Sequence, residues 1–210
     1  MSVSLCAGTL IVDDPDELLV TYLDPAAGYA YPAYDELVTN SFPTLVDGDL
    51  LAPSLLGAHV DLARFELLRT MLPDLSAGLA ALPPTSLAET DDDGIALVAA
   101  CFADLDHPRY SGHGVRGTIL SKVLHRKRPD LVPLYDSRIW TAYTAPGAVA
   151  RSGKRSWVEF MTLLCAQMRA DLQAESVELR RLVDVAQEHG ATLTPLRLLD
   201  ILVWMSSEPH

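Results

Sequence analysis

Apolar residues recur at helical spacing along most of this chain, and only one short run has the character of a strand. The clearest helical pattern joins Trp157, Met161, Leu164 and Met168. The apolar run Thr9–Val12 suits a strand, but a single strand cannot form a sheet. We therefore expect an all-α fold of about eight to ten helices.

Start and stop signals divide this pattern into separate helices. Asp61 is a typical N-cap, and we expect its helix to end at Pro73, because proline lacks an amide N–H and disrupts a helix interior. A second short helix is then expected over Leu75–Leu82. Thr194 followed by Pro195 predicts the start of the last helix.

The chain has 210 residues, which suits one domain. A Pro-Pro-Thr-Ser linker at 83–86 suggests an N-terminal helical part, 1–90, followed by a middle segment, 91–145, and C-terminal helices, 146–210. Apolar residues make up 49% and charged residues 21%, a composition that excludes disorder as the main state.

Composition also bears on the compartment. The sequence has no apolar run near the ~20 residues of a membrane span, and its first residues have no basic region typical of a signal peptide. Three scattered cysteines exclude a disulfide scaffold and favour a reducing environment. We expect a cytoplasmic protein without a membrane partner.

Charge is distributed unevenly. The chain carries a net −12, yet residues 107–155 hold ten basic and two acidic side chains, a net +8. The other 161 residues carry six basic and 26 acidic side chains, a net −20. Two interpretations stay open: a positive face that meets a polyanion, or a basic segment docked onto acidic neighbours within the fold.

Residues 111–140 hold the most informative motif, SGHGVRGTILSKVLHRKRPDLVPLYDSRIW. Gly112, Gly114 and Gly117 lead into an expected helix over 118–125. Glycines at a helix start allow close backbone approach and leave N–H groups that can face an anion. Asp136 is well placed as the N-cap of the next helix.

One template for this motif is the dinucleotide fingerprint, G-x-G-x-x-G followed by an acidic residue. Gly112, Gly114 and Gly117 fit the spacing, and Asp136 lies 19 residues further on. The fingerprint requires a strand directly before the first glycine. A polar loop, 104–111, occupies that place, and the chain offers no alternating β/α pattern, so this template is disfavoured.

The same stretch resembles the helix-hairpin-helix superfamily of DNA glycosylases. Gly112-His113-Gly114 matches the hairpin, and Arg128–Asp136 matches the return to a catalytic aspartate. The resemblance implies a helix-hairpin-helix unit within 91–145 and hydrolysis of N-glycosidic bonds assisted by Asp136. Arg116 stands where bifunctional members carry a nucleophilic lysine, and an arginine cannot form a Schiff base, so a monofunctional enzyme is implied.

The whole chain is also similar to a family of bacterial proteins for which no activity is known. The shared features are Lys127-Arg128-Pro129, Tyr135-Asp136-Ser137 and Leu199-Asp200 with Trp204-Met205. This second resemblance assigns no chemistry.

The glycosylase hypothesis gives roles to three groups of residues. Asp136 would stabilise positive charge at the sugar, and basic or glycine residues would contact phosphate. A structural alternative stays open for each: an N-cap or ion-pair role for Asp136, a tight turn for the glycines, and core packing for the aromatic residues. The predicted phosphate-binding residues are Gly112, Gly114, Arg116, Lys122, Arg126, Lys127 and Arg128, and the predicted base-stacking residues are Tyr110, Tyr135 and Trp140.

Two alternatives to the glycosylase hypothesis stay open. In the first, residues 111–140 bind nucleic acid or a nucleotide and catalyse no reaction. In the second, the basic face binds an acidic protein partner, including a second copy of this chain in a homo-oligomer. The sequence implies no cofactor, and no closed set of metal ligands is visible in it.

Overall fold

The computed structural model describes residues 2–29, 31–37, 42–108, 110, 114–144, 149 and 155–207, and these are mostly helical. Within them, every helix is too short or too polar to cross a bilayer. The elements are β1 (Val3–Leu5), β2 (Leu10–Val12), α1 (Pro15–Leu23), α2 (Asp47–Leu51), α3 (Leu62–Ala81), α4 (Asp92–Ala100), α5 (Gly117–His125), α6 (Ser137–Tyr143), α7 (Trp157–Ala174), α8 (Ser176–Glu188) and α9 (Pro195–Ser206).

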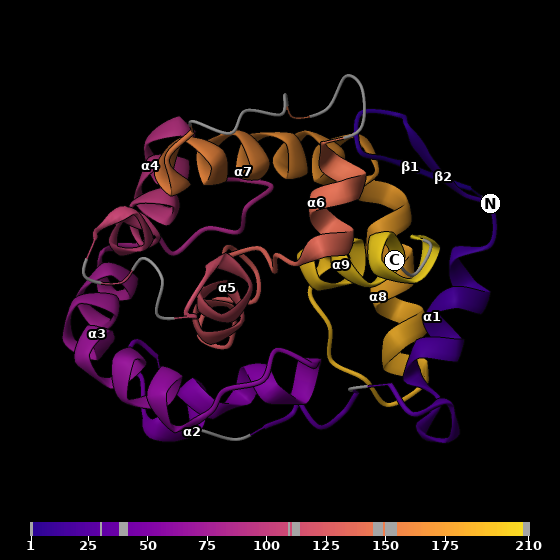
Figure 1. The fold of residues 1–210 in the computed structure, drawn as a ribbon. Helices are drawn as coiled ribbons and strands as arrows, with labels where there is room; N and C mark the ends of the chain where they lie inside the picture. The colour runs from indigo at the N-terminus through magenta and orange to yellow at the C-terminus, as the bar shows by residue number, and fades with distance from the viewer. Residues whose placement is uncertain are drawn as a thin grey trace.

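Helix α5 lies inside a ring of other helices (Figure 1). Eight of its nine residues are buried, because it is covered on the side of α2 and the following 3₁₀ segment, Ala52–Leu56, and at its start by Trp157. Helix α4 packs along α7, while α1 and α8 pack on α9. One apolar core includes residues from Val3 to Val203.

The expectation that Thr9–Val12 has no strand partner is wrong. Val3–Leu5 pairs antiparallel with Leu10–Val12, and Val3 faces Val12. The turn between the strands holds Cys6 and Ala7 at positive φ, which L-residues seldom adopt. The carboxylate of Asp171 on α7 accepts the Cys6 and Ala7 amide protons at 2.8 and 3.3 Å, a long-range support that no local pattern predicts.

The expected break at Pro73 is also wrong, because α3 runs through it from Leu62 to Ala81. Proline removes one intrahelical hydrogen bond. Pro73 and Arg69, four residues before it, are both exposed, so the interruption falls on the solvent side of α3. The apolar residues Leu68, Met71, Leu75 and Leu79 form one buried stripe across the proline.

The helix starts predicted from caps are confirmed where they matter for the site. The Oδ1 atom of Asp136 accepts the amide protons of Arg138 and Ile139 at 3.0 and 3.1 Å and begins α6. Thr194 accepts from the amide of Arg197 at 3.2 Å and begins α9. These two caps fix where the polar residues of both helices lie.

Candidate functional site

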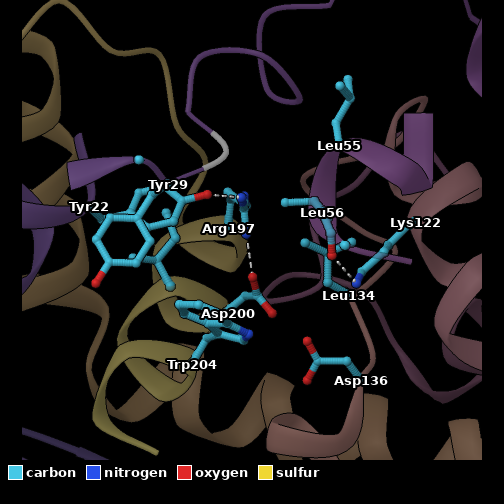
Figure 2. Close-up of a pocket in the computed structure, with 13 residues that line it drawn as sticks. Tyr22, Tyr29, Leu55, Leu56, Lys122, Leu134, Asp136, Arg197, Asp200 and Trp204 are labelled. Carbon is cyan, nitrogen blue, oxygen red and sulfur yellow. Dashed lines mark hydrogen bonds and ion pairs between the residues drawn. The ribbon is translucent and has the colours of Figure 1, made fainter. Parts of the chain in front are cut away.

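Asp136 and Lys122 line one pocket of about 240 Å³ (Figure 2). The pocket lies where α1, the 52–56 segment, α5, the start of α6 and α9 meet. Helix α9 contributes Arg197, Asp200 and Trp204. Two residues with separate roles in the sequence-based prediction therefore line one pocket, together with charged residues from the far end of the chain.

Two carboxylates reach this pocket from different elements. Figure 2 shows Asp136, at the start of α6, and Asp200, on α9, with their carboxylate groups turned toward each other. Asp136 is half-buried and Asp200 is buried. Burial raises the pKa of Asp200 to about 6, against the opposing attraction of Arg197, and the charge of Asp136 adds to the rise.

Two cations balance these carboxylates. Lys122 is 4% exposed, and its Nζ donates to the carbonyl oxygen of Leu56 at 3.1 Å. Burial lowers the pKa of the Lys122 ammonium, although Asp136 and Asp200 oppose this effect. Arg197 is 3% exposed and forms ion pairs with Asp35 and Asp200.

An aromatic wall closes the opposite side of the pocket from Lys122 (Figure 2). Tyr22 and Tyr29 stack with ring centres 5.6 Å apart, and Tyr29 meets Trp204 edge-on at 6.0 Å. The Arg138 guanidinium lies 3.9 Å from the centre of the Trp204 ring and fixes its orientation. A pocket with an aromatic wall and several charged groups pointing into it suits a ligand that has a planar ring with polar edges.

Besides Lys122, three more of the predicted phosphate-binding cations are engaged inside the fold. Lys127 pairs with Asp49 at 2.8 Å, with side chains 3% and 0% exposed. Arg126 and Arg128 donate to backbone carbonyl oxygens, at 2.6 Å for Tyr34 and at 2.7 and 2.8 Å for two carbonyls of the linker before α4. These contacts match the docked interpretation of the basic segment, and phosphate binding by the three residues stays a prediction.

The predicted hairpin is described only in part. Gly112 lies outside the described residues, and Gly114 has a φ of 83°, which favours glycine. A Cβ at Gly114 would lie 2.7 Å from the Arg64 Nε. Tyr110 is buried beside His107 and does not line the pocket of Asp136.

The remaining predicted residues meet in a second pocket. Arg116, Tyr135 and Trp140 line a groove of about 460 Å³ between the starts of α5, α6 and α7. Trp157 and Phe160 from α7 complete its aromatic wall. The predicted residues thus separate into a charged pocket with Asp136 and Lys122 and an aromatic groove with Arg116.

Sequence reasoning assigned no role to the α9 residues of the charged pocket. The one signal was the resemblance that includes Leu199-Asp200 and Trp204, which marked the positions without their chemistry. No sequence pattern marked Arg197, Tyr22 or Tyr29 as functional residues.

Across the described part of the chain, no group of three or more His, Cys, Asp or Glu is placed to hold a metal ion. Cys6, Cys101 and Cys165 are buried free thiols.

The model of a family of unknown function, DUF6308, matches residues 16–207. The chain belongs to DUF6308. Both pockets lie wholly within the DUF6308 region, whereas the β1–β2 hairpin precedes it. No curated protein and no solved structure matches the chain.

Proposed function

We propose that this protein hydrolyses N-glycosidic bonds and holds the nucleobase in the charged pocket. The observation that carries this proposal is the pair of carboxylates, Asp136 and Asp200, in one pocket with an aromatic wall. Glycosidic hydrolysis uses two carboxyl groups with different protonation states. The resemblance of residues 111–140 to DNA glycosylases supports the same chemistry.

The two carboxyl groups take different roles. Asp136, as the ionised carboxylate, stabilises the positive charge that develops at the anomeric carbon when the C–N bond breaks. Asp200, whose pKa is raised to about 6, donates a proton to the leaving base. Water adds its oxygen to the sugar, and one of its protons restores the acid.

Pocket size and charge favour a small substrate. The volume of about 240 Å³ lies below the roughly 300–1,000 Å³ of pockets for drug-sized ligands, which suits a base or a nucleoside. Lys127 and Arg128 are each 7% exposed, so these two cations of the basic cluster are not presented to a duplex backbone. We therefore favour a free nucleoside or nucleotide over a base within duplex DNA.

The first test is release of free base, measured by chromatography with mass detection. The panel contains nucleosides, deoxynucleotides and oligonucleotides with damaged bases. Asp136→Asn is expected to lower base release by about 100-fold or more, because it removes the stabilising charge and retains the shape. Asp74→Asn, an exposed carboxylate on α3, is the matched control and is expected to retain full activity.

Binding without chemistry is the second candidate, favoured because Asp200 is already engaged by Arg197. It predicts ligand binding that survives Asp136→Asn and no base release from any member of the panel. Base release that is equal in Asp136→Asn and in the unchanged protein would contradict the proposed role of Asp136.

A further inference from the structure

The aromatic groove lies on the other side of a short extended segment from the charged pocket. Along residues 134–137 the side chains alternate: Leu134 and Asp136 line the charged pocket, and Tyr135 and Ser137 line the groove. The backbone at Asp136 is extended, and extended backbone directs successive side chains to opposite sides. The groove is therefore a separate site.

The walls of this groove are aromatic. Tyr135 meets Trp157 and Phe160 edge-on, with ring centres 5.6 and 5.3 Å apart, and Trp140 lies 5.2 Å from Phe160. Tyr135, Trp140 and Trp157 are each half-buried. Half-buried rings held by their neighbours offer preformed surfaces on which a planar ligand can stack.

The same groove is positively charged in a chain of net charge −12. Arg116 and Arg155 are among the described residues that line it, and none of these lining residues is acidic. The side chain of Arg116 is exposed and makes no hydrogen bond or ion pair with another described residue, while its backbone carbonyl oxygen accepts the amide protons of Ile119 and Leu120. The nearby carboxylates of Asp106 and Glu159 accept amide protons at the start of α7 and lie outside the lining. The positive charge of Arg155 also contributes to the lowered pKa of the Glu159 carboxyl group, so Arg116 is the cation among the described lining residues that remains for a ligand.

We propose that the aromatic groove binds a nucleotide, with its base on the aromatic wall and its phosphate on Arg116. Guanidinium groups bind phosphate through paired hydrogen bonds, and stacking adds an affinity that inorganic phosphate lacks. The volume of about 460 Å³ falls within the range of small-ligand sites. This site stands independently of hydrolysis in the charged pocket.

The three tryptophans allow each pocket to report separately. Trp140 and Trp157 line the groove, and Trp204 lines the charged pocket. In a Trp204→Phe variant, the tryptophan fluorescence comes only from Trp140 and Trp157, which both line the groove. We expect a deoxynucleoside 5′-monophosphate to quench this fluorescence with an affinity at least about tenfold above that of inorganic phosphate.

Arg116→Ala is expected to weaken this binding by about tenfold or more, the loss of one charge-assisted contact. Arg180→Ala, at an exposed position of α8 outside both pockets, is the matched control and should bind the nucleotide unchanged. The same titration is repeated with a short single-stranded oligonucleotide. Tighter binding than the mononucleotide would identify a polymer as the source of the ligand.

Three results would overturn the nucleotide site. They are an unquenched Trp204→Phe variant, quenching that Arg116→Ala leaves unchanged, and equal affinities for inorganic phosphate and the nucleotide. Because the readout is binding, inactive Asp136→Asn protein that still quenches with nucleotide would separate this site from the proposed hydrolysis.

Discussion

At Asp200, burial and an ion pair act in opposite directions on one carboxyl group. Arg197 stabilises the charged form, and desolvation destabilises it. Desolvation is the larger effect, so the pKa rises from 3.8 to about 6. A carboxyl group in this state keeps its proton in mildly acidic solution, which is what a general acid requires.

This shift predicts a pH dependence of stability. The folded pKa lies above the ordinary value, so the stabilisation is complete below about pH 4 and is lost as pH rises through about 6. Relative to Asp200→Asn, which cannot titrate, the unchanged protein should lose on the order of 3 kcal/mol of unfolding free energy across this range. Urea unfolding of both proteins at a series of pH values measures the difference.

An opposite trend would contradict this assignment. If the unchanged protein gained stability relative to Asp200→Asn as pH rises, the attraction of Arg197 would exceed the cost of burial, and Asp200 would be an ordinary ion-pair partner.

Among the elements, the start of α5 is set by its contact with α7. A Cβ at Gly117 would lie 2.3 and 2.4 Å from two ring atoms of Trp157, closer than carbon atoms can approach. The glycine therefore permits the close approach of α7 to α5, and the same ring forms a wall of the aromatic groove.

Gly117→Ala is expected to destabilise the protein by about 1–3 kcal/mol, the usual cost of overpacking, although alanine favours a helix. Denaturant unfolding followed by tryptophan fluorescence measures the loss. In a Trp157→Leu background the same substitution should cost much less, because the ring is absent. A stabilising effect with Trp157 in place would contradict the proposed packing.

Sequence reasoning succeeded for elements whose signals are local. Asp136 and Thr194 begin helices as predicted, because a cap depends on residues two or three positions away. The strand Val3–Leu5 was missed, because its turn depends on Asp171. The predicted helix end at Pro73 was wrong because a local signal was overruled by tertiary packing. Burial of the apolar stripe of α3 stabilises the helix by more than the one lost hydrogen bond costs.

The candidate site shows the same contrast between residues marked by local sequence signals and residues brought in by long-range contacts. Asp136 and Lys122 belong to one motif, in which the sequence marked Asp136 as a catalytic candidate and Lys122 as a phosphate-binding candidate without predicting that they share a pocket. Arg197 reaches Asp35 across 162 positions, and no periodicity or spacing encodes such a pair. Formal charge alone also did not decide whether a cation such as Lys127 faces solvent or a buried carboxylate.

In the whole molecule, one apolar core joins the three sequence segments 1–90, 91–145 and 146–210. We therefore expect the protein to unfold in one cooperative thermal transition, with calorimetric and van 't Hoff enthalpies that agree. Differential scanning calorimetry tests this expectation. Two resolved transitions would show that a segment folds independently and would contradict a single domain.

The enclosed position of α5 has a consequence for how the chain reaches its folded state. A nine-residue helix is too short to persist alone in water. Its Lys122 contacts Leu56 and Tyr34 across 66 and 88 positions, and its first residue is covered by Trp157. Closing such long loops costs entropy before any contact forms, so folding slows as contact order rises. During synthesis, α5 therefore leaves the ribosome before its last covering helix exists and stays partly exposed until α7 follows.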